Sequence, residues 1–158
     1  MTHLCLYVDD ILITSSNTNY IKFIENKLTE KFDELTFHYG KVHQYLGMEL
    51  NFLVPGEVNI TMKNKINQLL DDFNITNIVT TPATNNLFLH NNKLPLLNDN
   101  DQKLLRSGVA KLLYLSINTR MDIALPVNYL CTRADKYTGD DKKRFIRILE
   151  YLNGTVQA

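Results

Sequence analysis

The stretch "LCLYVDDILIT", from Leu4 to Thr14, decides the fold of the first part of this chain. Two adjacent carboxylates, Asp9 and Asp10, stand between two apolar runs. Short apolar runs of this composition predict two strands joined by a tight turn, here at Asp9 and Asp10. The turn contains no glycine, although hairpin turns favour Asn-Gly or Asp-Gly because their central residues need positive φ.

Two adjacent carboxylates at the tip of an apolar hairpin repel each other, so their position needs a reason. A divalent cation supplies one, because hard oxygen ligands suit Mg²⁺ and its charge reverses the repulsion. Mg²⁺ in proteins often also binds substrate phosphates, so the hairpin points towards phosphoryl transfer. From the residues alone, a purely structural turn is an equally good interpretation.

Two further aspartate pairs occur, Asp71-Asp72 and Asp140-Asp141, and both have structural explanations. The first pair falls on the polar side of a predicted helix. The second precedes "KKRFIRIL", where acidic residues favour the start of a helix through its dipole.

The chain reads as a mixed α+β protein, with strands early and helices late. The hairpin is followed by a helix in "SSNTNYIKFIENKLTEKF", then by strand-like residues after Gly40 and a hairpin that turns at Pro55-Gly56. Later helices are expected in four segments, namely residues 63–73, 101–115, 122–130 and the C-terminal "TGDDKKRFIRILEYLNGT", with Gly154 as its cap. An Asn- and Pro-rich connector, "TTPATNNLFLHNNKLPLLNDND", is expected to link two lobes.

The composition is that of a globular chain of 158 residues, with 17 Lys+Arg and 17 Asp+Glu. A neutral total excludes a strongly basic chain that coats nucleic acid, but it allows a local basic face. Cys5 and Cys131 are far apart and in apolar surroundings, so we expect two small core residues in a reducing compartment. No secretory signal or membrane span is apparent, so an intracellular protein is expected, cytoplasmic or nuclear and not secreted.

The sequence "YVDD" between apolar strands resembles the catalytic hairpin of reverse transcriptases. The later segments "KFDELTFHYGKVHQYLGMEL", "TTPAT", "RSGVAKLLYLSINTRMDIALPVNYLCTR" and "KKRFIRILEYLNGT" follow in the order found in the polymerase of copia-type LTR retrotransposons. The resemblance implies an RNA-directed DNA polymerase, part of a Pol polyprotein that assembles in virus-like particles. Its expected partners are an RNA/DNA primer–template and deoxynucleotides.

The resemblance also implies an architecture and site residues. Residues 1–62 correspond to part of a polymerase palm, with the catalytic hairpin, a helix and a primer-grip hairpin. Residues 63–80 begin the thumb, 81–100 form the connector, and 101–158 are a helical thumb and connection region. Asp9 and Asp10 are expected to ligate two catalytic Mg²⁺ ions, with primer and template contacts at Tyr7, Val8, Tyr45, Leu46 and Gly47.

Lys142, Lys143 and Arg147 lie largely off the apolar stripe of the last predicted helix. They could contact template–primer phosphates, because each neutralised phosphate adds salt-dependent affinity. A solvated charged face is the competing interpretation of such a run.

The family also uses an aspartate on an earlier palm strand, together with fingers that bind the nucleotide. The hairpin begins at Leu4 here, so the sequence holds one half of the metal site. We therefore expect the 158 residues to be inactive alone and to need an N-terminal polymerase portion. A non-catalytic nucleic-acid-binding module and an inert retroelement remnant are the alternatives.

Overall fold

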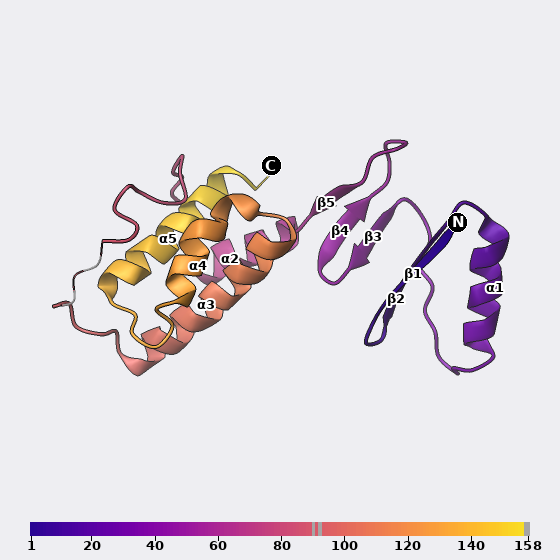
Figure 1. Cartoon of the computed structure of the whole chain (residues 1–158), viewed down its shortest axis with the longest axis horizontal. Coiled ribbons are helices and arrows are strands. Elements are labelled where there is room, and N and C mark those ends of the chain that lie inside the picture. Colours follow the sequence, from indigo (N-terminus) through magenta and orange to yellow (C-terminus); the bar gives the residue numbers. More distant parts are fainter. Residues whose placement is uncertain (90, 92, 157–158) are drawn as a thin grey trace. The chain divides into compact units, whose positions relative to one another are not determined.

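The computed structural model describes residues 1–89, 91 and 93–156, and it divides at Thr61 and Met62 into two compact units. The first unit contains every named strand of the described residues together with one helix, and the second unit is helical (Figure 1). This confirms a mixed fold with strands early and helices late. The assignment of the units to palm, thumb and connection region stays a prediction.

The first unit opens with the expected hairpin, in which β1 (Thr2–Tyr7) pairs antiparallel with β2 (Asp10–Ser15). Helix α1 (Thr18–Thr29) follows at once. Its N-cap is Asn17, whose side chain accepts a hydrogen bond from the backbone N–H of Asn19 at 2.9 Å and so satisfies one open helix donor.

A second antiparallel sheet has the order β3 (Val42–Tyr45), β4 (Met48–Asn51) and β5 (Asn59–Thr61). The strand-like region expected after Gly40 is therefore two strands, because the chain reverses at Leu46 and Gly47. Both residues have positive φ, 53° and 74°, which is the pattern of a type I′ hairpin turn. The turn expected at Pro55-Gly56 is present, with Gly56 at φ 82°.

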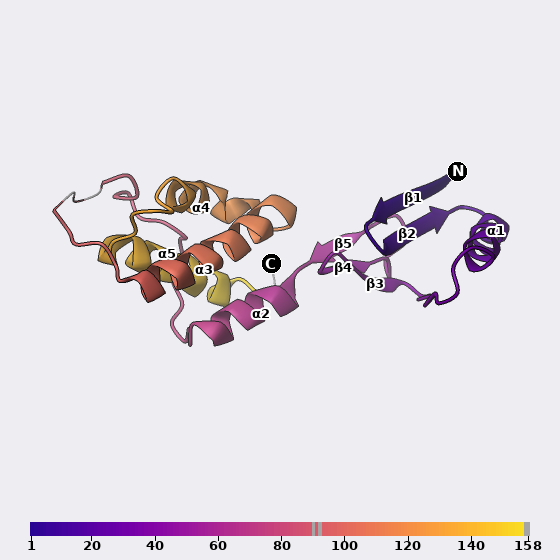
Figure 2. The ribbon, with the colours of Figure 1, turned by 90° about the horizontal axis from the view of Figure 1, so that it is seen from below.

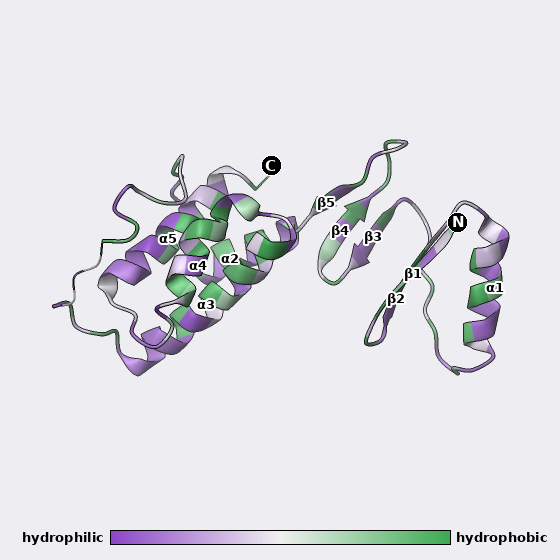
Figure 3. Ribbon diagram, viewed as in Figure 1, coloured by the Kyte–Doolittle hydropathy of each residue, from purple (hydrophilic) through white to green (hydrophobic). Residues whose placement is uncertain are grey.

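The second unit contains α2 (Lys63–Asp72), α3 (Asp99–Asn118), the short 3₁₀ helix η1 (Met121–Ile123), α4 (Ala124–Cys131) and α5 (Gly139–Gly154). Helices α3, α4 and α5 lie side by side (Figures 1 and 2). Figure 3 shows hydrophobic residues along the ribbons of these helices, and most of the side chains that they bury are apolar. The stripe expected on the last helix is confirmed, because all four of its members are fully buried: Phe145, Ile148, Leu149 and Leu152.

The connector before α3 is irregular, as expected, but it runs within the second unit rather than between the two units. It is fastened along α5. The hydroxyl of Thr81, in the connector, accepts a hydrogen bond from Arg147 at 2.9 Å. Just before the connector, the backbone carbonyl of Asn77 accepts one from Asn153 at 3.0 Å. His90 and Asn92, which belong to the expected connector, lie outside the described residues.

Three expectations about single residues are wrong. Cys5 is exposed and Cys131 is only half-buried, so neither is a core residue. Cys5 is exposed because β1 belongs to a sheet of two strands and nothing in the described structure covers its face. Gly154 is the last residue of α5 rather than its cap, which is Thr155.

In the described residues, no helix has both the length and the apolar character needed to cross a membrane.

Candidate active site

The β1–β2 hairpin turns one residue earlier than the sequence predicts. Tyr7 pairs with Asp10, so the two-residue loop consists of Val8 and Asp9. Asp10 is therefore the first residue of β2 and not part of the loop. The pairing of the two strands determines which residues form the loop. A shift of this pairing by one residue would also move every side chain of a strand to the other face of the sheet.

Val8 adopts a positive φ of 51° at the first central position of the loop, where a type II′ turn would favour glycine. A β-branched residue in this region is strained. Strain of this kind persists only when the surrounding structure holds it, and it is common at functional sites. The sequence has no glycine at this turn, and Val8, directly before Asp9, takes the strained position with positive φ instead.

Asp9 and Asp10 are both exposed, and both line one cleft of about 340 Å³ in the first unit. The other walls come from β2, from α1, from the segment that precedes β3, and from β3 itself. The cleft thus brings the β1–β2 hairpin together with the strand that carries Tyr45. An open cleft next to two carboxylates leaves room for a ligand that bridges them.

A hydrogen bond ties the two sheets of the first unit together at this cleft. The hydroxyl of Tyr45, on β3, donates to the backbone carbonyl of Cys5, on β1, at 3.2 Å. Loss of solvent around the phenol, followed by electrostatic interactions with Cys5 and Asp10, raises the pKa of Tyr45. Tyr45 therefore stays protonated at neutral pH and acts as a donor.

Tyr39 and Glu25 also line the cleft. The pKa of Tyr39 is raised by loss of solvent and by its hydrogen bond to Glu25. The sequence analysis missed Glu25. Its signal was the helical spacing of Ile21, Glu25 and Leu28, which puts a carboxylate on the face of α1 that carries apolar residues.

The remaining predicted residues of the first unit lie at two turns. Tyr7 and Val8 are exposed at the tip of the β1–β2 hairpin. Leu46 and Gly47 form the β3–β4 turn beside Tyr45, but they do not line the cleft. The structure therefore gathers Asp9, Asp10 and Tyr45 in one place and leaves the other residues at the rims of the two hairpins.

The predicted basic residues lie on α5 in the second unit and differ from one another. Lys142 pairs with Asp101 at 3.4 Å, and Lys143 pairs with Asp140 at 3.6 Å. The Lys143 side chain is 83% exposed, and that of Lys142 is 49% exposed. Arg147 is half-buried and holds the connector, so the two lysines are the residues of this set that face solvent.

A magnesium site can draw on Asp9 and Asp10 alone. In the part of the chain that the structure describes, no three His, Cys, Asp or Glu side chains gather closely enough to hold a metal. Two adjacent carboxylates still suit Mg²⁺, because this ion keeps several waters and often takes one or two carboxylates together with substrate phosphates. The donor set fits the ion but does not enclose it.

A family of known proteins matches this hairpin and the residues that follow it. The family described as "Reverse transcriptase (RNA-dependent DNA polymerase)" matches residues 2–85, which include the first unit except Met1, together with α2. The chain belongs to the reverse transcriptase family. The resemblance to the polymerase of copia-type retrotransposons is thereby confirmed.

Curated relatives of this reverse transcriptase family member are similar to it over nearly all of its 158 residues. The Pol polyprotein of transposon RE2 from Arabidopsis thaliana is 32% identical over 158 residues, which cover 97% of this chain and 10% of the polyprotein. The Pol polyprotein of transposon TNT 1-94 from Nicotiana tabacum is 29% identical, over 96% of this chain and 12% of its own length. An uncharacterized mitochondrial protein of Arabidopsis thaliana is 30% identical, over 98% of this chain and 62% of its own length.

The chain thus spans about a tenth of these polyproteins and less than two thirds of the mitochondrial relative. No solved structure matches it.

Proposed function

We propose that this chain carries the metal-binding hairpin and the primer grip of a retrotransposon RNA-directed DNA polymerase. The observation that supports this best is the shared cleft of Asp9, Asp10 and Tyr45, at a hairpin whose strained Val8 precedes the carboxylates. Residues 1–62 would be part of the palm, and residues from Lys63 onward would be thumb and connection region.

The chemistry assigned to the intact polymerase is attack of a primer 3′-hydroxyl on the α-phosphate of a deoxynucleoside triphosphate, which breaks the bond to the β-phosphate, releases pyrophosphate and gives the hydroxyl proton to solvent. Asp9 and Asp10 would hold Mg²⁺, whose positive charge would stabilise the negative charge on the reacting phosphate oxygens. The residues of the β3–β4 hairpin, Tyr45, Leu46 and Gly47, would hold the primer end. The hydrogen bond from Tyr45 to the carbonyl of Cys5 would fix the distance between grip and carboxylates.

At the hairpin the described residues bring together two carboxylates and no third potential ligand close enough to complete a metal site. We propose that polymerase activity requires at least one further acidic ligand. We therefore expect no primer extension by the 158-residue polypeptide with Mg²⁺, an oligo(dT) primer on poly(rA), and dTTP. Template-dependent extension that disappears in Asp9→Asn would contradict this expectation and show that the pair is sufficient.

Metal binding at the hairpin can be tested separately with Mn²⁺, a paramagnetic substitute for Mg²⁺. We expect Mn²⁺ to broaden the backbone amide NMR signals of residues 6–12 at concentrations that leave other signals sharp, and Mg²⁺ to reverse the effect. The broadening should be lost in Asp9→Asn and should persist in Asp71→Asn, which changes another exposed aspartate pair. Equal broadening around Asp71 and Asp9 would argue against a metal site at the hairpin.

Contact with nucleic acid is proposed for the exposed lysines of α5. The double variant Lys142→Ala/Lys143→Ala should weaken binding to an RNA–DNA hybrid and reduce the salt dependence of affinity by up to about two phosphate contacts. Arg147→Ala should instead lower stability with a smaller effect on the salt dependence, because its guanidinium holds Thr81. If the double lysine variant and Arg147→Ala had equal effects on hybrid binding and on thermal unfolding, the assignment of separate roles to the lysines and to Arg147 would be refuted.

A further inference from the structure

Two arginine side chains of α5, Arg144 and Arg147, lie under the first part of the connector. This part, residues 81–89, is here called the cover, and it runs beside α5 (Figure 1). Nη2 of Arg144 donates a hydrogen bond to the backbone carbonyl of Leu89, and Nη2 of Arg147 donates one to the hydroxyl of Thr81 at 2.9 Å. Both acceptors are neutral, and the cover contains no charged side chain.

Each of these guanidinium groups keeps a buried donor that has no acceptor. In the described residues, Nη1 of Arg144 and Nε of Arg147 are enclosed and make no hydrogen bond. The same holds for the hydroxyl of Tyr129, whose ring centre lies 5.5 Å from the Arg144 guanidinium. Buried polar groups without a partner lower stability and are rare, so their presence together beneath the cover needs an explanation.

Positive charge is in excess where α5 meets the cover. Asp141 lies 2.7 Å from Nε of Arg133 and 3.5 Å from Nη1 of Arg144, so two guanidinium groups share its charge. Arg147 forms no ion pair in the described residues and bonds to a hydroxyl instead. The carboxylate of Glu150, one turn further along α5, accepts a hydrogen bond from an asparagine side chain at 3.2 Å. The Arg144 side chain is only 16% exposed, so water and salt screen its charge weakly.

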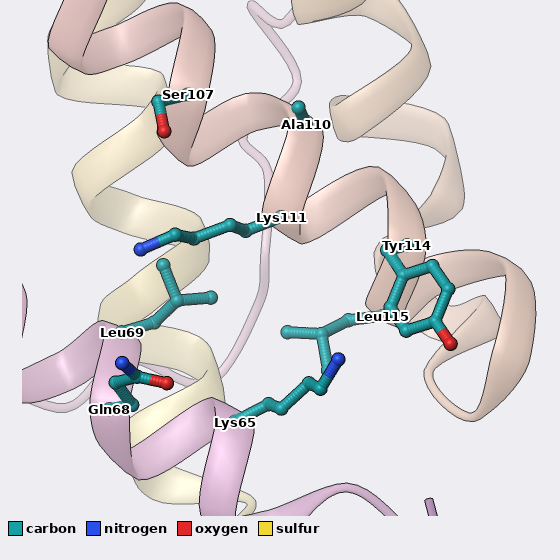
Figure 4. Close-up of a pocket in the computed structure, with 8 residues that line it drawn as sticks. All are labelled: Lys65, Gln68, Leu69, Ser107, Ala110, Lys111, Tyr114 and Leu115. Atoms are coloured by element: carbon teal, nitrogen blue, oxygen red, sulfur yellow. The ribbon is translucent and has the colours of Figure 1, made fainter. Parts of the chain in front are cut away.

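Figure 4 shows the cations of a groove between α2 and α3 in the same unit, and their contacts are of another kind. Lys111 pairs with Asp72 at 2.8 Å, and the ammonium of Lys65 lies 4.5 Å from the centre of the Tyr114 ring. Among the described residues, no side-chain polar atom that lines this groove is both buried and without a hydrogen bond. The unmet arginine donors are therefore a feature of the contact between α5 and the cover.

Few buried groups attach the cover to the second unit. Among residues 81–89, all of which the structure describes, Leu87 is the one buried side chain, whereas Phe88 and Leu89 are 63% and 69% exposed. The Phe88 ring contacts the Tyr129 ring edge to face, with centroids 5.6 Å apart. Displacement of the cover would therefore expose the apolar surface of little more than one side chain, a cost that a strong competing ligand can offset.

From these contacts we propose that Arg144 and Arg147 form a phosphate site, and that a bound phosphate group displaces the cover, which occupies the site in the free chain. Phosphate oxygens accept several hydrogen bonds from guanidinium groups and bring the negative charge that the cover lacks. The phosphate belongs to the backbone of an RNA–DNA primer–template. This choice of source rests on the proposed function, in which Lys142 and Lys143 of the same helix contact that backbone.

The test is NMR spectroscopy of the side-chain Nε–Hε groups of Arg144 and Arg147 in the ¹⁵N-labelled 158-residue chain. One sample receives inorganic phosphate in exchange for chloride at constant ionic strength, and a second receives an RNA–DNA hybrid. We expect saturable shifts of both arginine signals, together with the backbone amides of residues 81–89, at the same ligand concentration. Arginine signals that stay in place with both ligands, or that move while the cover does not, would overturn the proposal.

The two ligands separate this proposal from the proposed function. Shifts at lower concentrations of hybrid than of inorganic phosphate would identify the nucleic-acid backbone as the source of phosphate. Shifts with inorganic phosphate alone would support the site with free phosphate as its ligand, and would count against nucleic-acid binding by α5. Hybrid binding that is weakened by Lys142→Ala/Lys143→Ala but leaves the arginine signals in place would refute the site and leave the proposed function intact.

Variants of the cover test the competition itself. Thr81→Val removes the acceptor of Arg147 and keeps the shape of the side chain, so it should tighten phosphate binding at least twofold. Thr84→Val, in the same cover but bonded to neither arginine, is the matched control and should leave binding unchanged. Arg147→Lys keeps the charge without the planar fork, so it should weaken binding at least threefold and cancel the effect of Thr81→Val. Unchanged or weaker binding in Thr81→Val alone would show that the cover does not compete with phosphate.

Discussion

At the residue scale, the loop of the β1–β2 hairpin places a strained residue, Val8, directly before a charged one, Asp9. Val8 has a positive φ that costs an L residue with a branched side chain about 1–2 kcal/mol. Asp9 follows it in the loop, and Asp10 begins β2. The sequence revealed the carboxylates, but only the strand register showed that valine and not aspartate occupies the strained position.

Val8→Gly should stabilise this hairpin, because glycine adopts positive φ without a steric cost. Glycine loses more backbone entropy than valine when the hairpin forms, and this cost offsets part of the relieved strain. We expect a net gain of about 0.5–1 kcal/mol in the free energy of local opening of β1 and β2. Hydrogen exchange of the hairpin amides measures it. Val42→Gly, in a strand and without positive φ, should destabilise, and a similar loss in both variants would show that Val8 is not strained.

Asp141 is the most buried charged residue of the second unit, with no exposed surface. One carboxylate oxygen accepts a hydrogen bond from Nε of Arg133 at 2.7 Å. The other accepts hydrogen bonds from the backbone N–H and the hydroxyl of Thr138, both at 2.9 Å. This is more than the dipole interaction expected from the sequence, because Asp141 closes a capping box and pairs with a nearly buried arginine.

Asp141→Asn should therefore destabilise the second unit by about 3–5 kcal/mol, since it leaves Arg133 without its charge partner. Asp140→Asn is the matched control, because Asp140 is partly exposed and its pair with Lys143 is worth at most about 1 kcal/mol. Urea unfolding followed by circular dichroism compares the two. Equal losses would mean that the buried pair contributes no more than a surface pair.

The same carboxylate predicts a pH dependence. Burial alone would raise the pKa of Asp141, but hydrogen bonds from Arg133 and Thr138 outweigh it and lower the pKa. A pKa that is lower in the folded state gives stability that is complete above the unfolded pKa, about 3.9 for Asp, and that is lost as pH falls through the folded pKa. Urea unfolding between pH 2 and 6 should show this loss, and it should be smaller in Asp141→Asn.

At the scale of elements, the packing of α3 on α5 depends on a glycine in the middle of a helix. A Cβ atom on Gly108 would lie 2.5 Å from Cζ of Phe145 and 3.1 Å from Cζ of Phe73. These two rings pack edge to face, with centroids 4.7 Å apart. Helix propensity alone favours alanine over glycine, so the close approach of the rings explains why glycine is needed here.

Gly108→Ala should lower the free energy of unfolding by about 1–3 kcal/mol, because the cost of overpacking exceeds the gain of about 1 kcal/mol in helix propensity. Gly139→Ala, at the start of α5 with nothing within 4 Å of the added atom, should be neutral or stabilising. Thermal unfolding of both variants measures the difference. A stabilised Gly108→Ala would show that the rings move aside without cost.

At the scale of the whole molecule, the two units differ in how much apolar surface they bury. In the first unit, which is described throughout, Leu50 is the one apolar side chain classed as buried. The described residues of the second unit have a core that extends from α2 to α5, and its fully covered aliphatic and phenylalanine side chains are Leu112, Leu115, Ile123, Val127, Leu130, Phe145, Ile148, Leu149 and Leu152. Burial is the main favourable term in folding, so the two units should differ in stability.

A polypeptide of residues 62–158 should therefore fold alone, with a cooperative thermal transition and full helicity. In the 158-residue chain, amides of β1 to β5 should exchange with solvent faster than those of α3 to α5. Circular dichroism and native-state hydrogen exchange measure these properties. Equal protection of strands and helices would show that the first unit is more stable than its exposed apolar residues suggest.

The sequence by itself determined the family, the order of strands and helices, and the pair Asp9-Asp10. Local periodicity and an ordered series of motifs carry this information, because both depend on neighbours along the chain. It also identified the buried stripe of α5, since that stripe repeats at helical spacing.

Only the tertiary structure decided which residues meet. It placed Val8 in the hairpin loop, joined Tyr45 to Cys5, added Glu25 to the cleft and fastened the connector to Arg147. It also exposed Cys5, which an apolar sequence context had suggested was buried. These facts depend on strand register and on contacts between residues far apart in the chain, and neither is encoded in a local pattern.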